Sequence, residues 1–211
     1  MAKEKIYFVR DKETFKVFTM VEEAENYAAS KGNLAIKTFD NLEQLKLYDL
    51  SLRLGGAEGF AMSHEYIKED SIIIWSDGSY SKELNSIGYG YVITRGSYTI
   101  FKKGGKVPYS DDYSANNILG ECHAVLKALL YCAVKGLDKP NIIVAHDYIG
   151  VGSWIEGKWK TKTELAKRYY EEVISYKKDM EIHFCNIPGH SKEFIMNNEA
   201  DKLAKNGLKM D

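Results

Sequence analysis

One short segment restricts the fold more than any other part of the sequence. Residues 71–80, SIIIWSDGSY, run from three isoleucines and a tryptophan into a carboxylate at Asp77. Side chains alternate between the two faces of a strand, so apolar residues lie on both faces, with Ile73 and Trp75 on the face of Asp77. Such a strand is expected at the centre of a sheet that is covered on both sides. An ionised Asp at its end needs hydrogen bonds, a cation or a function.

The rest of the sequence up to residue 211 predicts an α/β domain around this strand. Two strand-like segments, GYGYVIT and SYTIFKK, follow it and indicate an antiparallel meander. A helical pattern from Asn117 to about Lys135 precedes the apolar strand NIIVAHD, and a strand that follows a helix implies a parallel addition to the sheet. The segment after Trp154 predicts more helix, EIHFCNI a last strand and MNNEADKLAKNG a terminal helix. The expected fold is a mixed sheet flanked by helices.

The N-terminal part predicts a smaller, separate unit. Strand-like segments KIYFVR, FKVFT and LAIKTF alternate with a helix at 21–30 and a short helix in NLEQLKLYDL, which together predict an α+β module. Residues 51–70 contain three glycines and no sustained hydrophobic period, which is typical of a connector. We therefore expect one domain over residues 1–50, a linker over 51–70 and a second domain over 71–211.

Composition limits the location and the partners of the chain. No apolar run approaches the roughly 20 residues of a membrane helix, and the first ten residues lack the apolar centre of a signal peptide. The three cysteines, Cys122, Cys132 and Cys185, are an odd number without metal-ligand spacing, which favours buried, reduced thiols. A net charge of −1 permits nucleic acid as a partner without requiring it. We expect a cytoplasmic monomer that has no membrane partner.

Four carboxylates lie where apolar residues would be expected. Asp77 and Asp147 end apolar strands, Glu121 shares a helix face with apolar residues, and Asp201 lies in the terminal helix. Any one of them could be a cap or an ion-pair partner, and Asp201 could face solvent. Several anions that converge at one end of a sheet, however, repel each other unless cations neutralise them. Because hard oxygen ligands suit Mg²⁺ or Mn²⁺, the set predicts a divalent-metal site.

Four motifs, in their order along the chain, resemble type 1 ribonuclease H. They are DGS after an apolar strand, GECHAVLKAL on a helix, AHDYIGVGSW after another strand, and IPGHSKEFIMNNEADKLAK near the end. The resemblance implies a five-stranded mixed sheet whose first three strands are antiparallel. It also implies hydrolysis of the RNA strand of RNA/DNA hybrids, with little sequence specificity and with 5′-phosphate and 3′-hydroxyl products. The cofactor would be two Mg²⁺ ions, for which Mn²⁺ could substitute.

The resemblance also implies a role for each catalytic residue. Asp77 would bridge both ions, Glu121 and Asp147 would complete their coordination, and Asp201 would help to hold the ion on the side of the attacking water. His190, in the GHS loop, matches a mobile histidine that assists proton transfer or product release. A single loop histidine can also be an ordinary surface residue.

Four further residues of the second domain are candidate substrate contacts, two from the resemblance and two from a basic run. Ser79 and Asn117 match family positions near the RNA, although they could also be a turn hydroxyl and a helix N-cap. Lys158 and Lys160, on either side of Trp159, form a candidate ridge for phosphate groups, or simply a solvated surface. Recognition of a hybrid through 2′-hydroxyls and phosphates depends on shape more than on base edges.

The N-terminal unit is similar to the hybrid-binding, or viroplasmin-like, domain that precedes the catalytic domain in many type 1 enzymes. Lys37 and Phe39 keep its KxF feature, whereas its glycine-rich turn and helix-start tryptophan are absent, with DKET and Met20 near those places. Residues 1–50 carry 8 basic and 9 acidic side chains, which argues against strong phosphate binding. We expect a degenerate domain of this fold with reduced affinity.

Two other classes of function remain open from the sequence. The chain could be a different metal-dependent nuclease or a strand-transfer enzyme of the same superfamily, because a fold alone does not fix a reaction. It could also be a non-catalytic nucleic-acid-binding protein that retains the carboxylates as relics. Loss of any one acid would favour the second alternative, and all four are present.

Overall fold

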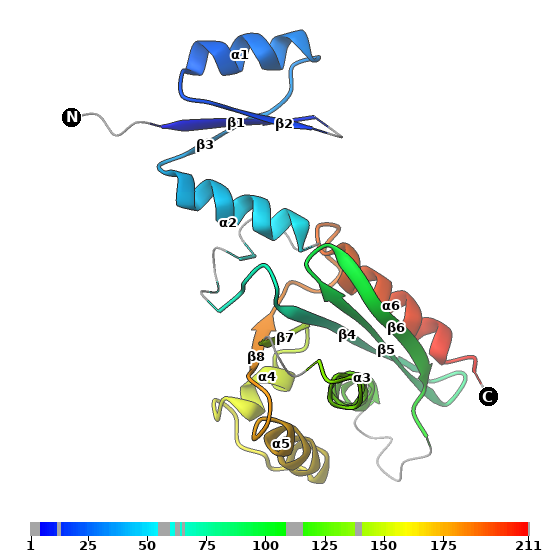
Figure 1. Ribbon diagram of the computed structural model, residues 1–211. Helices are drawn as coiled ribbons and strands as arrows, with labels where there is room; N and C mark the ends of the chain where they lie inside the picture. The colour runs from blue at the N-terminus through cyan, green and yellow to red at the C-terminus, as the bar shows by residue number, and fades with distance from the viewer. Residues whose placement is uncertain are drawn as a thin grey trace.

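The protein contains two β-sheets that belong to different parts of the chain (Figure 1). The structure, a computed structural model, describes residues 5–11, 14–54, 60–61, 64, 66–108, 116–137 and 141–210. A three-stranded sheet forms near the N-terminus, and a five-stranded sheet forms from the later strands. The two sheets are built independently of each other, because no strand of one pairs with a described strand of the other.

The N-terminal sheet is antiparallel and has a helix on each face (Figure 1). Its strands, in the order β2-β1-β3, are β1 (Ile6–Arg10), β2 (Phe15–Phe18) and β3 (Ile36–Phe39). The helices are α1 (Val21–Ser30) and α2 (Leu42–Arg53). On one face Val9 packs with Ala24 and Ala28 of α1. On the other face Phe8 packs with Tyr48 of α2, so alternation along β1 serves two small cores.

The larger sheet has five strands in the order β6-β5-β4-β7-β8. Adjacent strands are antiparallel from β4 through β6, and both β4 with β7 and β7 with β8 are parallel. The strands are β4 (Ile72–Ser81), β5 (Ser86–Arg95), β6 (Tyr98–Lys106), β7 (Ile142–His146) and β8 (Ile182–Asn186). The expected five-stranded mixed sheet, with its first three strands antiparallel and the apolar strand at its centre, is confirmed.

Helices cover both faces of this sheet (Figure 1). They are α3 (Asn116–Lys135), α4 (Gly150–Ile155), α5 (Glu164–Tyr176) and α6 (Ile195–Gly207). Ile72 and Ile74 of β4 belong to the core that α3, α4 and α5 share, whereas Ile73 and Trp75 belong to the core on the α6 face. All four side chains are fully buried. The alternation along β4 therefore supplies both cores.

Helix α3 differs from one expectation drawn from the sequence. Among the described residues, it is long and apolar enough, by length and composition alone, to cross a membrane. A core helix of a globular domain passes the same test, and the face of α3 that carries Val125, Ala128 and Leu129 is fully buried against the sheet. The apolar character of α3 thus has an explanation in the core of this domain.

The segment expected to be a connector is partly embedded in the second domain. Helix α2 continues to Arg53, and Leu50 and Leu54 at its C-terminal end join the core that contains Trp75. Phe60 and Ile67 are 4% exposed and lie in the same core. The domain boundaries stay a prediction, but the described residues around them contact the five-stranded sheet.

The helix predicted after Trp154 is interrupted. Helix α4 ends at Ile155 and α5 begins at Glu164, with Gly157 between them in the left-handed region at φ 72°. Thr163 then caps α5, because its side-chain oxygen accepts a hydrogen bond of 3.2 Å from the Ala166 N–H. Turn and cap residues override the helical pattern here, so Lys158 and Lys160 lie on a connection between helices.

We predict that Leu54→Ala lowers the free energy of unfolding of the second domain by about 2–5 kcal/mol, because a fully buried leucine leaves a cavity when it is truncated. Leu54 is 1% exposed and packs in the core that contains Trp75. Urea denaturation followed by tryptophan fluorescence measures the effect, since all three tryptophans lie in residues 71–211. Leu42→Ala is the matched control, because Leu42 is 54% exposed. Equal unfolding midpoints for the two variants would contradict the packing described.

Candidate metal centre

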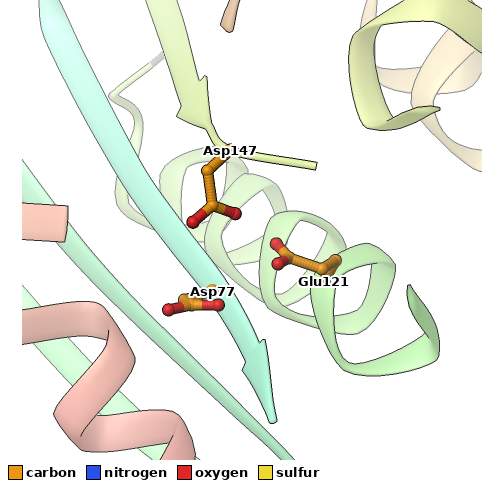
Figure 2. Close-up of side chains that lie close together, drawn as sticks. All are labelled: Asp77, Glu121 and Asp147. Carbon is orange, nitrogen blue, oxygen red and sulfur yellow. The ribbon is translucent and has the colours of Figure 1, made fainter. Parts of the chain in front are cut away.

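Three carboxylates meet at one end of the five-stranded sheet. Asp77 lies in β4, Glu121 lies in α3, and Asp147 directly follows β7. Each offers an oxygen atom that lies within 4.8 Å of those offered by the other two. Figure 2 shows the three side chains directed toward one another. Asp77 and Glu121 are buried, and Asp147 is half-buried.

A close contact between two backbones brings these carboxylates together. Strands β4 and β7 are parallel neighbours with Trp75 opposite Ala145, so Asp77, within β4, lies next to Asp147, directly after β7. The sequence predicted that Asp77 ends its strand, but β4 continues to Ser81. Helix α3 approaches β4 so closely that a Cβ atom on Gly78 would overlap the backbone of Glu121. A Cβ on Gly120 would likewise overlap the carbonyl group of Gly88. The contact requires glycine at 78 and 120, and it delivers Glu121 to the side of Asp77.

The site is electrostatically strained without a cation. Burial raises the pKa of Asp77 from 3.8 to about 7, with a further contribution from the charge of Asp147. The N–H group of Gly78 donates a hydrogen bond of 2.7 Å to Asp77 Oδ1, which only partly offsets these effects on the pKa. Burial, and then the charges of Asp77 and Asp147, hold the pKa of Glu121 well above its usual range. The fold thus holds Asp77 and Glu121 in a place where ionising both carboxyl groups is unfavourable.

The donor set fits a divalent cation. Glu121 Oε2 is buried, and no hydrogen-bond partner for it occurs among the described residues. Ionised carboxylates can only accept hydrogen bonds or bind cations, and an all-oxygen set suits hard ions such as Mg²⁺. Asp77, Glu121 and Asp147 form the only group of three or more potential metal ligands found within the described ranges. The metal site predicted from the sequence therefore has a structural counterpart in these three residues.

Asp201 lies near this group but outside it. Its charge contributes to the raised pKa of Asp77, which locates its carboxylate within electrostatic range. Asp201 Oδ2 accepts a hydrogen bond of 2.7 Å from Lys205 Nζ, one turn further along α6. Helix α6 lies directly on the sheet, because a Cβ on Gly90, the register partner of Asp77 in β5, would overlap the carbonyl group of Ala200. The fold thus brings the fourth acid beside the cluster, where its carboxylate is paired with the ammonium group of Lys205.

His190 lies in the loop between β8 and α6. The residue before it, Gly189, lies against Asp147, because a Cβ on that glycine would come within 2.8 Å of Asp147 Oδ2. His190 itself is exposed and has a left-handed backbone at φ 53°. Its loop therefore borders the carboxylates, while its imidazole is accessible to a substrate.

Two of the predicted RNA contacts flank the carboxylates. Ser79 is half-buried in β4 and shares a face with Asp77, two residues earlier. Asn117 is exposed and is the second residue of α3, so it lies within the helix and is not its N-cap. The carbonyl of Asn117 takes part in the contact with Gly78.

The two predicted phosphate contacts lie beside an aromatic cluster. Lys158 Nζ is 2.6 Å from Glu156 Oε2, and Lys160 is exposed. Trp159 between them is 42% exposed and makes edge contacts with Tyr148 at 6.4 Å between ring centroids. Because Tyr148 follows Asp147 in the chain, the contact between Trp159 and Tyr148 brings the two lysines near the end of β7 that carries the Asp147 carboxylate.

The two candidates in the N-terminal unit differ in accessibility. Lys37 is half-buried, with Nζ 5.1 Å from the centroid of the Tyr48 ring. Phe39 is 8% exposed and packs against Tyr48 and Phe8 in the core under α2. The ring of Phe39 is mainly a core element, and Lys37 presents the more accessible polar group.

Sequence reasoning missed Asn197. This residue lies on α6 one turn before Asp201, is 3% exposed, and has an amide oxygen without a hydrogen-bond partner among the described residues. The spacing of four residues from Asp201 in NNEAD was the available signal, since residues four apart share a helix face. Asn197 is therefore a further polar group on the helix that carries the fourth acid.

Comparison with known families identifies the domain that carries these residues. The RNase H profile matches residues 69–209, which is more than half of the chain. The chain belongs to the RNase H family. Family membership and fold support a nuclease that acts on RNA/DNA hybrids, and the acidic cluster is consistent with dependence on a metal.

Solved structures agree on the fold. RNase H1 from the halophilic archaeon Halobacterium salinarum NRC-1 is 20% identical and has a TM-score of 0.55, covering 65% of this chain and 97% of its own. LC11-RNase H1, in complex with an RNA/DNA hybrid, is 22% identical with a TM-score of 0.55, and the match covers 65% of this chain and 96% of LC11-RNase H1. An RNase H domain from Mycobacterium tuberculosis is 19% identical with a TM-score of 0.55, and the match covers 65% of this chain and 93% of that domain's chain. No curated protein matches the chain.

The raised pKa of Asp77 predicts an unusual pH dependence of stability. Because the folded-state pKa is about 7 and the ordinary value is 3.8, the folded protein binds this proton more tightly than the unfolded chain does. The metal-free protein should therefore lose stability as pH rises from about 4 to about 7. A bound divalent cation replaces the proton, so stabilisation by Mg²⁺ should increase over the same range.

Thermal unfolding of the protein and of Asp77→Asn, with Mg²⁺ or with EDTA, measures this effect. Burial lowers the pKa of His123 and of His146 to about 4, so their titration makes the protein more stable as pH rises, which opposes the effect of Asp77. Both proteins contain these histidines, so the difference between their pH profiles reports the effect of Asp77. Identical pH profiles of melting temperature for both proteins in EDTA would show that Asp77 is not the strained group.

Proposed function

We propose that the protein is an endoribonuclease that hydrolyses the RNA strand of RNA/DNA hybrids with two divalent ions. The products are a 5′-phosphate and a 3′-hydroxyl end, and the ion is Mg²⁺, for which Mn²⁺ can substitute. The observation that carries this proposal is the group of Asp77, Glu121 and Asp147, within 4.8 Å of one another on an RNase H fold. LC11-RNase H1, which shares the fold, binds an RNA/DNA hybrid.

The carboxylates supply the metal ligands in this proposal. When bound, two divalent ions activate a water molecule on one side of the scissile phosphate and stabilise the leaving oxygen on the other. Asp77 lies on β4, which contacts both α3 and β7, and it is the residue that would bridge the ions in this proposal. Asp201 approaches from α6 on the other face and completes the site after Lys205 releases it.

His190 is proposed to transfer a proton or to assist product release. It lies on the exposed loop that borders Asp147, where it can reach a substrate without ligating metal. Groups that act as general acids or bases contribute about 10² to 10⁴ in rate, so His190 would assist a reaction that the carboxylates make possible.

Substrate recognition is proposed to depend on strand shape. Ser79 and Asn117 flank Asp77 and Glu121, so they can contact 2′-hydroxyls of an RNA strand whose phosphate lies at the carboxylates. Lys158 and Lys160, beside Trp159, would contact phosphates of the DNA strand. None of these contacts reads base edges, which accounts for low sequence specificity.

The N-terminal unit lies outside the segment that matches the RNase H family, and it is proposed to be a degenerate hybrid-binding domain because its sequence keeps the KxF feature of Lys37 and Phe39. With Phe39 in the core, Lys37 is its main candidate contact. Binding through this unit would add to the affinity of the catalytic domain by tethering. We also propose that the protein is a cytoplasmic monomer, and its three free, buried cysteines fit a reducing compartment.

The decisive assay compares four substrates of one sequence with Mg²⁺: an end-labelled RNA/DNA hybrid, duplex RNA, duplex DNA and single-stranded RNA. We predict cleavage of the RNA strand in the hybrid alone, with fragments that carry 5′-phosphate and 3′-hydroxyl ends, and none in EDTA. Cleavage of duplex DNA would favour a different nuclease of the superfamily. Hybrid binding without cleavage in Mg²⁺ or Mn²⁺ would favour the non-catalytic alternative.

Asp77→Asn is the matched control for that assay. The amide keeps the shape of the side chain and removes one negative charge from the metal site, so cleavage should fall by at least about 100-fold while hybrid binding persists. Both are measured on one preparation with an intact thermal transition. Cleavage at the normal rate by the folded variant would contradict the metal assignment.

A further inference from the structure

A segment outside the RNase H match completes the core on the α6 face. The family match begins at residue 69, yet Leu54, Phe60 and Ala61 are at most 4% exposed and belong to the same core as Trp75. The N–H group of Ala61 donates a hydrogen bond of 2.8 Å to Ser51 Oγ, which ties the segment to α2. The catalytic sheet therefore depends on side chains that the family domain does not supply.

Phe60 is the member of this segment that contacts the elements of the active site. Its ring lies 5.5 Å from the ring of Trp75 and 5.9 Å from the ring of Phe194, measured between centroids. Trp75 and Phe194 are themselves 6.2 Å apart, so the three rings form one cluster. All three are at most 5% exposed, and aromatic contacts of this kind stabilise one arrangement of the rings.

Two of the rings that Phe60 contacts, those of Trp75 and Phe194, lead directly to proposed catalytic groups. Trp75 precedes Asp77 by two residues on the same face of β4. Phe194 is the residue from which α6 begins, and its carbonyl accepts a hydrogen bond of 3.0 Å from the Asn198 N–H in the first turn. The loop of His190 ends at Phe194, and Asp201 lies about two turns into the helix. The position of Phe194 thus sets both the start of α6 and the end of the loop.

We propose that Phe60 is a positioning residue for the reaction, acting through Phe194 on Asp201 and His190. This inference rests on the proposed nuclease function. The ring of Phe60 fills the space between β4 and the start of α6, and this fixes the distance from Asp201 to Asp77. Because Phe60 follows α2, whose first two turns pack in the N-terminal core at Leu45 and Tyr48, the catalytic geometry is also linked to the N-terminal unit.

The test compares Phe60→Ala with Phe60→Leu in the full chain, below the melting temperature of each. Truncation to alanine should lower kcat by about 10- to 100-fold, because small displacements of catalytic groups are costly, with KM for the hybrid little changed. The Mg²⁺ concentration for half-maximal rate should rise, and Mn²⁺ binding measured by electron paramagnetic resonance should weaken in parallel. Phe60→Leu, which refills most of the volume, should restore both kcat and the metal affinity.

Phe101→Ala is the matched control. Phe101 is half-buried in β6, stacks on Tyr131 at 4.1 Å and packs against the core on the α3 face. Its truncation therefore destabilises the same sheet from the face opposite Phe194. Its Mg²⁺ requirement should match that of the unaltered protein. If Phe60→Ala lacks a cooperative thermal transition, Phe60→Val replaces it, with the same expected direction.

The possible failures are distinguishable. An unaltered protein that does not cleave hybrid refutes the proposed function, and the Mn²⁺ measurement still compares the variants. A folded Phe60→Ala or Phe60→Val with the kcat and Mg²⁺ requirement of the unaltered protein refutes the positioning role. Equal losses of kcat and metal affinity in Phe101→Ala would also refute it, because they would reduce the effect to general destabilisation.

Discussion

The close contact between α3 and β4 is the constraint on which the rest of the site depends. Glycine at 78 and 120 allows two backbones to touch where any Cβ would hold them apart, and this places Glu121 beside Asp77. The parallel pairing of β4 with β7 adds Asp147 to the same end of the sheet. Burial, together with the charge of the neighbouring Asp147, raises the pKa values of Asp77 and Glu121, so folding produces a site with a deficit of positive charge.

The second face of the sheet determines how the site is completed. Helix α6 rests on the backbone of β5 at Gly90 and brings Asp201 toward Asp77, while its first residues adjoin the loop of His190. Phe60 packs on the start of this helix from outside the family domain. The two cores therefore serve different parts of the site, since one holds Glu121 and the other holds the helix of Asp201.

Much of this architecture follows from local pattern. Apolar segments that run into Asp77 and Asp147, and a helix with Glu121 on its apolar face, were sufficient to predict a mixed sheet with acids. Its five strands followed from the resemblance to ribonuclease H, and the continuation of β4 past Asp77 to Ser81 was not predicted. The packing of Phe60 on Phe194 joins residues 134 positions apart, and no periodicity in the sequence encodes such a contact. Asn197 was missed because its spacing of four residues from Asp201 distinguishes it from a surface asparagine only once its burial is known. The break before α5 depends on Gly157 and on the cap at Thr163, which outweigh the helical pattern around them.

The most direct test of the central claim is to locate the metal. Crystals grown with Mn²⁺ and a hybrid, using His190→Ala to slow cleavage without removing a metal ligand, should give anomalous difference peaks bounded by Asp77, Glu121 and Asp147, with carboxylate oxygens at about 2.1 Å. A second peak toward Asp201, with Lys205 displaced from its 2.7 Å contact, would accord with the two-ion proposal. Well-ordered hybrid at the sheet end without any anomalous peak among these carboxylates, while Mn²⁺ supports cleavage by the unaltered protein, would contradict the account.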